Sequence, residues 1–341
     1  MKQSVKTGLV AAMALAGATG AALAQAKTLD AIKARGTISC GVGTGLAGFG
    51  QPDDKGAWTG LDVEFCRAVA AAVFNDPQKV TFKPLSAKER FTALQSGEVD
   101  LLARNSTWTI SRDSSLGLSF AAINFFDGQG FMVKKSLGVK SAKELKGATV
   151  CVQTGTTTEL NLADYFRSNK LDYKPVVFEK NDEVVAAYDG GRCDAFTTDA
   201  SGLYAERLRM KSPDDHIVLP EIISKEPLGP VVRQGDSQWF TIVKWVHYAM
   251  LNAEELGVTQ ANVAEMAKST NPDIKRMLGA EGDFGKGLGL DNDWVIRIVK
   301  AVGNYGESYE RNVGSGSRLK IARGLNNQWN NGGLQYSPPI R

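Results

Sequence analysis

Two arginines frame the polar stretch Arg104-Asn-Ser-Thr-Trp-Thr-Ile-Ser-Arg112, which directly follows an apolar segment with the pattern of a buried strand. An arginine placed just after a strand end can hold a carboxylate through two parallel N–H···O bonds. Thr107 can add a hydroxyl or an amide to the same group. For Arg112 taken alone, a solvated loop charge is the commoner explanation, so the stretch is informative only together with other groups.

A second polar stretch, Thr154-Gly-Thr-Thr-Thr158, leads into an expected helix whose free amides favour an anion. Asp199 follows another expected buried strand and supplies the negative charge that an α-ammonium group requires. Together these groups complement a zwitterion, with a cation and amides for the carboxylate and an acid for the amine. For the threonines, ordinary helix capping is the alternative explanation.

Short apolar strands alternate with amphipathic helices along the chain, which predicts an α/β fold with largely parallel sheets. Leu61, Phe65 and Val69 recur every fourth residue, as on the buried face of a helix. The expected strands cover residues 37–42, 80–85, 99–104, 149–153, 176–179 and 194–198. The expected helices cover residues 62–74, 88–95, 158–168 and 182–188, and the chain from residue 237 onward is mostly helical.

The segments 93–105 and 187–199 share one pattern, a helix end, a glycine, an aspartate and a buried strand that ends in a polar residue. Glycine at a helix-to-strand junction is common, but it does not account for a polar group at both strand ends. Ligands of open α/β sheets bind outside the carboxyl ends of the strands. Two lobes facing each other would therefore bring Asn105 and Asp199 to one cleft.

Motifs for cofactors and catalysis are weak in this chain. Gly43-Thr-Gly-Leu-Ala-Gly48 fits the GxGxxG dinucleotide pattern, but that motif must open directly into a helix, and here a turn-rich stretch follows. The two histidines are His216, in a polar stretch that we expect to be solvated, and His247, in an expected helix. Since the sequence has no CxxC motif and no cysteine–histidine cluster, we expect no metal site. Neither histidine stands out as the positioned imidazole of a catalytic arrangement, so we expect no enzymatic activity and no cofactor.

The amino terminus is typical of a secretory signal peptide, which we predict at residues 1–26. Lys2 and Lys6 precede an Ala- and Leu-rich run that closes on the small-x-small pattern Ala24-Gln25-Ala26. A membrane anchor is the alternative, but a spanning helix needs about 20 strongly apolar residues. Loss of both lysines lowers the formal net charge from +3 to +1, which argues against a nucleic-acid partner.

Without the predicted signal peptide of 26 residues, the 341-residue chain is still long for one compact domain, which favours two lobes. The four widely spaced cysteines favour disulfides in an exported protein. We favour the pairing Cys40–Cys66 and Cys151–Cys193, one bridge in each lobe, although four cysteines allow three connectivities.

Gly60-Leu-Asp-Val-Glu-Phe65 resembles the signature of the family 3 extracellular solute-binding proteins, in which such a string opens the first helix. The Leu-Gln-Ser-Gly-Glu-Val-Asp-Leu stretch at residues 94–101 and the Thr-x-x-Arg step that ends at Arg112 are similar to the cleft of the same family. The resemblance covers essentially the whole mature chain. The endings at residues 322–329 and 332–341 are similar to the subgroup of general L-amino-acid-binding proteins.

This resemblance implies a type II periplasmic-binding-protein fold, with two lobes joined by hinge strands near residues 130–134 and 229–233. Lobe 1 would comprise residues 27–130 plus 232–341, and lobe 2 residues 131–231. The implied function is that of a periplasmic, monomeric component of an amino-acid ABC importer. Such a protein captures free L-amino acids by hinge closure and delivers them to the inner-membrane permease subunits.

Within the cleft, the resemblance implies that Arg112 and Thr107 hold the ligand carboxylate, with help from the Thr156–Thr157 amides. Asp199 would hold the ligand ammonium group, and Asn105 would offer its backbone carbonyl.

The chain departs from the family pattern in two places. Ala87 stands where relatives of narrow specificity often carry an aromatic ring, and Gly43–Gly45 stands where some relatives place an acid. These departures favour broad recognition, with Leu46, Phe49 and Trp108 lining the side-chain pocket. Core packing is the alternative for Trp108.

Two other functions fit the same fold. Exported cyclohexadienyl dehydratases resemble it and use the same cleft, but the motif stretches of this chain contain no evident acid–base pair. A ligand-sensing binding protein would present its closed form to a separate receptor.

Overall fold

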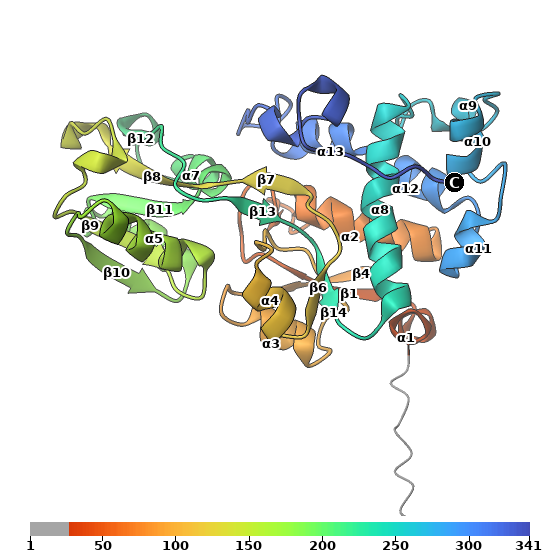
Figure 1. The fold of residues 1–341 in the computed structure, drawn as a ribbon, viewed down its shortest axis with the longest axis horizontal. Coiled ribbons are helices and arrows are strands. Elements are labelled where there is room, and N and C mark those ends of the chain that lie inside the picture. Colours follow the sequence, from red (N-terminus) through yellow and green to blue (C-terminus); the bar gives the residue numbers. More distant parts are fainter. Residues whose placement is uncertain (1–26) are drawn as a thin grey trace, which may run out of the picture.

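In the computed structural model, which describes residues 27–341, the chain forms two lobes around two five-stranded sheets (Figure 1). The predicted signal peptide lies outside the described residues. The first sheet has the order β4 (Val80–Pro84), β1 (Ile38–Val42), β5 (Leu101–Leu102), β14 (Val231–Arg233) and β6 (Leu118–Phe120). The second has the order β10 (Lys174–Phe178), β9 (Thr149–Gln153), β11 (Ala195–Asp199), β8 (Gln129–Lys134) and β12 (His216–Val218).

Three strands of each sheet run parallel, β4, β1 and β5 in the first and β10, β9 and β11 in the second. The strands that return from the opposite lobe, β14 and β8, join their sheets antiparallel. This arrangement confirms the predicted α/β, type II periplasmic-binding fold. Because β1 and β5 are parallel neighbours, their carboxyl ends lie at one edge of the first sheet, and the same holds for β9 and β11 in the second sheet. The segments that follow these four strands can therefore meet between the lobes.

An antiparallel pair of short strands, β7 (Phe125–Asp127) and β13 (Glu226–Leu228), connects the two lobes (Figure 1). The hinge predicted near residues 130–134 and 229–233 was therefore placed too late in the chain. Those stretches are apolar because they belong to β8 and β14, which are buried within the two sheets. The true hinge carries the polar residues Asp127 and Glu226, which gave no strand signal.

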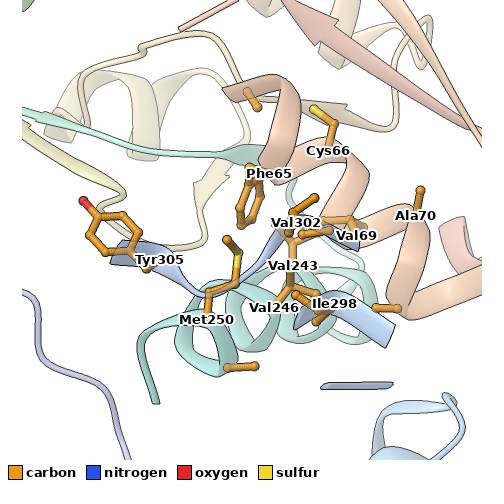
Figure 2. Packing of buried hydrophobic residues seen from close by; sticks show 14 of the residues in the cluster. Phe65, Cys66, Val69, Ala70, Val243, Val246, Met250, Ile298, Val302 and Tyr305 are labelled. Carbon is orange, nitrogen blue, oxygen red and sulfur yellow. The ribbon is translucent and has the colours of Figure 1, made fainter. Parts of the chain in front are cut away.

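The core of the first lobe forms where α2 (Leu61–Phe74) packs on α8 (Ser237–Glu255) and α12 (Trp294–Val302). Figure 2 shows Phe65 and Val69 of α2 beside Val243 of α8 and Ile298 of α12. The predicted apolar stripe of the helix at residues 62–74 is thus the buried face. The remaining helices on this side of the lobe are α1 (Thr28–Arg35), α9 (Val263–Met266), α10 (Pro272–Met277), α11 (Phe284–Leu288) and α13 (Tyr305–Asn312).

The opposite face of the first sheet is covered by α3 (Arg90–Gln95) and the adjoining short helix α4 (Ile110–Ser115). Thr109 caps α4, because its Oγ1 accepts a hydrogen bond from the Arg112 amide at 3.3 Å. The sequence analysis assigned no element here, since six residues are too few to show helical periodicity. A small hairpin, β2 (Gln51–Pro52) with β3 (Trp58–Thr59), precedes α2.

Helices cover both faces of the second sheet. Phe131 and Val133 of β8 pack with α5 (Thr157–Ser168), whereas Met132 points to the other face with α6 (Asn181–Asp189) and α7 (Ala200–Arg207). This alternation follows from the two-residue period of a strand. Within residues 27–341, no helix has both the length and the apolar character needed to cross a membrane.

Both predicted disulfides are present, Cys40–Cys66 between β1 and α2 and Cys151–Cys193 between β9 and the residue pair that precedes β11. Each bridge stays within one lobe, so neither restricts the hinge. The sulfurs are buried, which protects them from reductants in the folded state.

The second bridge should contribute strongly to lobe stability, because it closes a loop of 42 residues in the unfolded chain. Replacing Cys151 and Cys193 together by alanine should lower the free energy of unfolding by about 2–4 kcal/mol. Urea denaturation of both proteins measures the difference, and a reductant should abolish most of it. An unchanged midpoint without reductant would contradict the assignment.

Candidate functional site

A cavity lies between the lobes and is lined by residues of both. In the first lobe the lining comes from the loop after β1, the start of α3 and the segment after β5. In the second lobe it comes from the segment after β9 and from the end of β11 with α7. The lining residues are Gly43, Thr44, Gly45, Leu46, Arg90, Arg104, Asn105, Thr107, Gln153, Thr156, Thr157, Thr158, Asn181, Thr198, Asp199, Gly202 and Glu206.

Most of the predicted site residues lie on this cavity. Asn105 follows β5 and Asp199 ends β11, so the two repeated strand ends do meet at one place. The glycine-rich loop contributes Gly43–Leu46 to the same wall, and the chain turns through β2 and β3 before any helix begins. The loop therefore lacks the helix that a dinucleotide pyrophosphate requires.

Arg112 is buried in α4 but is not among the lining residues. Its Nη1 donates to the carbonyl oxygen of Thr107, a lining residue, at 2.7 Å. Its guanidinium also lies 4.9 Å from the centre of the Phe91 ring. Burial lowers the pKa of Arg112, while the charges of Glu226 and Asp199 raise it. The group is thus close to both acids and stays a cation.

Arg90, at the start of α3, is a lining residue that the sequence reasoning missed. Its side chain is almost fully buried, and its Nε has no hydrogen-bond partner within residues 27–341. Burial and the charges of Arg104 and Arg112 lower its pKa, whereas Asp199 raises it. A buried guanidinium with donors left over at a cavity is suited to bind an acceptor group.

Asp199 supplies the negative charge on the opposite side. It is 7% exposed, and no donor among residues 27–341 contacts its carboxylate. Burial raises its pKa well above the ordinary value, and the charges of Asp127 and Glu226 raise it further, against Arg90 and Arg112. An ammonium group placed in the cavity would give this carboxylate the partner that it lacks.

Asp62, in the first turn of α2, fixes the segment after β5. Its Oδ2 accepts the Asn105 amide at 2.8 Å, and its Oδ1 accepts Asn124 Nδ2 at 3.4 Å. Asn105 has a φ of 34°, an uncommon left-handed value that this bond helps to hold. Burial raises the pKa of Asp62 to about 6 despite both bonds and the nearby charge of Arg104.

The amino end of α5 faces the cavity with Thr156, Thr157 and Thr158. Thr156 caps this helix, because its Oγ1 accepts the Glu159 amide at 3.1 Å and donates to the Gln153 carbonyl at 2.7 Å. The capping alternative is therefore correct for the Thr156 hydroxyl. The amides of the first turn have no acceptor within the helix and remain suited to an anion.

The two lobes touch each other around the cavity. Lys88 Nζ of the first lobe lies 2.6 Å from Glu179 Oε1 of the second. Gly155 approaches so closely that a Cβ there would lie 3.4 Å from the Lys88 Cα. Glu226 Oε2 accepts hydrogen bonds from Thr107 at 2.6 Å and from Thr157 at 2.8 Å, which belong to opposite lobes. The structure is a closed arrangement.

Several predictions for side chains near the site were wrong. Trp108 does not line the cavity, because it stacks on Phe120 at 5.7 Å and is 38% exposed. Phe49 packs edge-on against Phe125 in the first-lobe core. His216 is buried rather than solvated, with its Nδ1 2.9 Å from the Tyr188 hydroxyl. Leu46 does line the cavity.

The sequence analysis also did not single out Arg90, Asp127 and Glu226. Arg90 could have been found, because it begins the helix after a predicted strand, where ligands of α/β sheets bind. Arg104 was named only as the first residue of the polar stretch at residues 104–112. Burial lowers the pKa of Arg104 to about 10. For Asp127 and Glu226 no local pattern marks the hinge.

Residues 38–262 match the bacterial extracellular solute-binding proteins, family 3. The chain belongs to this family. The family resemblance inferred from the Gly60–Phe65 string is thus confirmed. The match includes the hinge and all residues that line the cavity, while the helical tail continues beyond it.

Relatives extend over the full length of the chain. General L-amino acid-binding periplasmic protein AapJ of Rhizobium johnstonii is 63% identical over 343 residues, and the alignment covers all of both chains. Glutamate/glutamine/aspartate/asparagine-binding protein BztA of Rhodobacter capsulatus is 56% identical over 342 residues, again with full coverage.

A solved structure is also similar. The ABC transporter periplasmic binding protein from Brucella ovis, with glutathione bound, superposes with a TM-score of 0.92 at 66% identity. The superposition covers 93% of this chain and all of that one.

The raised pKa of Asp62 makes a prediction for stability. A buried acid whose folded pKa exceeds its unfolded value of 3.8 stabilises the fold at low pH, and this contribution is lost as pH rises through about 6. Between pH 7.5 and 4.5, the ligand-free protein should therefore gain about 2 kcal/mol relative to Asp62→Asn. Urea titrations of both proteins across this range provide the test. A pH-independent difference would show that Asp62 is ionised throughout.

Proposed function

We propose that this protein is the periplasmic substrate-binding component of an amino-acid ABC transporter. It binds a free L-amino acid between its lobes and delivers it to the permease subunits in the inner membrane. The observation that carries the proposal is the cavity itself, where both lobes present buried charges with donors or acceptors that have no partner within residues 27–341.

The relatives support amino acids as the ligand class. AapJ and BztA are named for binding amino acids, and the Brucella structure holds glutathione. Glutathione carries a free α-ammonium and α-carboxylate at its glutamyl end, so it has the same head group as an amino acid. A site for this head group accounts for all three ligand descriptions.

The head group fits the cavity in one orientation. The ligand ammonium pairs with the carboxylate of Asp199, and the Asn105 carbonyl adds an acceptor. The ligand carboxylate lies toward Arg112, whose Nη1 donates to the Thr107 carbonyl while its side-chain Nε and Nη2 have no hydrogen-bond partner within residues 27–341. The Thr156–Thr157 amides complete this end. Asp199 and Arg112 then each face an opposite charge.

Arg90 and Arg104 provide the selectivity beyond the head group. Arg90 is the better candidate for contact with the ligand side chain, because Arg104 already donates to the Leu85 carbonyl at 3.0 Å. A guanidinium can bind a carboxylate or an amide oxygen, which includes glutamate, glutamine, aspartate and asparagine. With the small Gly43–Leu46 loop opposite, the proposed specificity is broad.

Binding proceeds by closure about β7 and β13. The ligand docks on the lobe that carries Arg112, and the second lobe then brings Asp199 and the start of α5 around it. Closure excludes water, which strengthens each charged contact. The permease recognises the closed shape. The cleaved segment 1–26 and the monomeric state are parts of this proposal. The lobe limits expected at residues 130 and 231 move to β7 and β13, because β8 belongs wholly to the second sheet and β14 wholly to the first.

The assigned charges can be tested by substitution. Arg112→Ala and Asp199→Asn should each weaken binding of L-glutamate roughly a hundredfold or more, because each leaves a buried opposite charge without its partner. Isothermal titration calorimetry of the mature protein measures this, and the ligand should be recovered chemically unchanged. Arg167→Ala is the matched control, since that arginine lies on the exposed face of α5. Affinities within about fivefold of the parent would reject the roles.

The role of Arg90 has a distinct signature. Arg90→Ala should weaken binding of L-glutamate and L-glutamine about tenfold or more, because their side-chain acceptors lose a charged donor. Binding of L-alanine, which has no such acceptor, should change by less than about threefold. The same calorimetric titrations, run with all three ligands, make the comparison. An equal loss of affinity for all three ligands would show that Arg90 contacts the ligand head group instead of the ligand side chain.

A further inference from the structure

The C-terminal tail, residues 313–341, reaches the hinge through Asn326, which is 4% exposed. The Asn326 Oδ1 accepts the Phe126 amide at 2.6 Å, and its Nδ2 donates to the Phe126 carbonyl oxygen at 3.0 Å. Phe126 is the central residue of β7, and β13 is the only strand that pairs with β7 within residues 27–341. The side-chain amide of Asn326 thus takes the place of a neighbouring strand along the other edge of β7.

Asn326 is itself held on the first lobe. Its backbone carbonyl accepts hydrogen bonds from Arg323 Nε at 3.1 Å and from Arg323 Nη2 at 3.0 Å. Arg323 Nη2 also lies 3.0 Å from Glu254 Oε1 of α8, and its guanidinium lies over the Tyr305 ring of α13. Helices α8 and α13 belong to the first-lobe core. The two hydrogen bonds of Asn326 therefore fasten Phe126 to the first lobe.

The other hinge strand is tied to the same lobe at the facing residue. Pro227 of β13 lies opposite Phe126, and its carbonyl oxygen accepts the Trp108 amide at 2.8 Å. Nearby, the Gly229 amide donates to the Ser106 carbonyl oxygen at 3.0 Å. Residues 106 and 108 belong to the segment that follows β5 of the first sheet. Both strands are therefore attached to the first lobe up to the facing pair Phe126 and Pro227.

The next facing pair, Asp127 and Glu226, is tied to the second lobe. The Asp127 carboxylate accepts the hydroxyl of Ser201 in α7 and, at 3.4 Å, the Ser201 amide. Asn161 Nδ2 of α5 donates to Glu226 Oε1 at 2.7 Å. The bond between Glu226 and Thr107 crosses the closed cleft. Asp127 and Glu226 therefore move with the second lobe.

The attachment changes at one step on each strand, between Phe126 and Asp127 on β7 and between Glu226 and Pro227 on β13. We propose that Asn326 is a positioning residue for lobe closure, which pins β7 to the first lobe at Phe126 and confines the pivot to these two adjacent steps. Asn326 does not line the cavity and acts on ligand binding only through the hinge. The inference rests on the proposed function in one respect, which is that ligand binding closes the lobes.

A confined pivot reduces the freedom that ligand binding must remove. Without the contact to Asn326, the bend would spread over the whole of β7, so the ligand-free protein would sample a wider range of openings. Closure would then cost more conformational entropy, and the ligand affinity would fall. A purely structural role for Asn326 predicts a less stable first lobe with an unchanged range of openings. The test must therefore separate stability from opening.

Asn326→Leu removes both hydrogen bonds at nearly constant side-chain volume, and Asn304→Leu is the matched control. Asn304 is also 4% exposed and also lies in the first lobe. Its side chain likewise accepts one backbone amide, that of Glu307, and donates to one backbone carbonyl, that of Val258. Both variants should lower the urea midpoint by similar amounts, because each leaves a backbone amide and a backbone carbonyl without their partners.

Only Asn326→Leu should change the opening. Spin labels on Thr92→Cys of α3 and Glu183→Cys of α6, two exposed positions on opposite lobes, report the interlobe distance. The four native cysteines are in disulfides, so the labels attach to the introduced thiols. Without ligand, the distance distribution of Asn326→Leu should be broader than those of the parent and of Asn304→Leu. Calorimetry should show L-glutamate affinity about fivefold or more below the parent for Asn326→Leu, and less than about twofold below it for Asn304→Leu.

Asn326→Asp is a milder change that tests the same contact. It keeps the acceptor for the Phe126 amide and removes the donor to the Phe126 carbonyl, so its distance distribution and affinity should fall between those of the parent and of Asn326→Leu. If Asn326→Leu does not fold, this variant decides. Hydrogen exchange of the Phe126 amide, followed by NMR in the parent protein, should be equally slow with and without L-glutamate, because both partners lie on the first lobe.

Distance distributions of both Asn326 variants that match the parent would overturn the proposal, whatever their stability. An unchanged affinity would also overturn it, as would a control Asn304→Leu that broadens the distribution equally or a Phe126 amide that is protected only with ligand. Failure of the parent protein to bind any amino acid would instead overturn the proposed function. The distances in the ligand-free variants would still test the role of Asn326.

Discussion

Closure of the lobes brings together buried opposite charges that form no ion pair with one another within residues 27–341. The first lobe carries the buried residues Arg90, Arg104 and Arg112, and the second lobe carries Asp199. No donor among the described residues forms a hydrogen bond with the Asp199 carboxylate. An uncompensated buried charge costs several kcal/mol. A zwitterion supplies a cation to Asp199 and an anion to the arginines, so its binding and the closed arrangement stabilise each other.

The hinge takes part in this balance. Asp127 of β7 accepts hydrogen bonds from the Gly128 amide and the Ser201 hydroxyl, and burial raises its pKa to about 6. Glu226 of β13 accepts from residues of both lobes. The hydrogen bonds of Glu226 to Thr107 and Thr157 thus depend on closure. This links the motion to the chemistry of the cavity without any contact between the hinge acids and the ligand.

The sequence predicted those features of the structure that depend on residues close together in the chain. The helix predicted at residues 62–74 and the strands that precede Asn105 and Asp199 follow from periodicity and strand order. The two disulfides were favoured because each then stays within one lobe, although four cysteines allow three pairings. The hinge was misplaced because two short strands with acidic residues show no apolar pattern. Glu226 was missed because its partners Thr107 and Thr157 lie 119 and 69 residues away. His216 was judged by its acidic neighbours, although its partner is the remote Tyr188.

The most direct test is a crystal structure of the mature protein with L-glutamate. We predict the ligand between the lobes, with its amino nitrogen about 3 Å from a carboxylate oxygen of Asp199 and its α-carboxylate within about 3 Å of the Arg112 guanidinium. A ligand bound in the reverse direction, or bound outside the cavity while the lobes remain closed, would contradict the account.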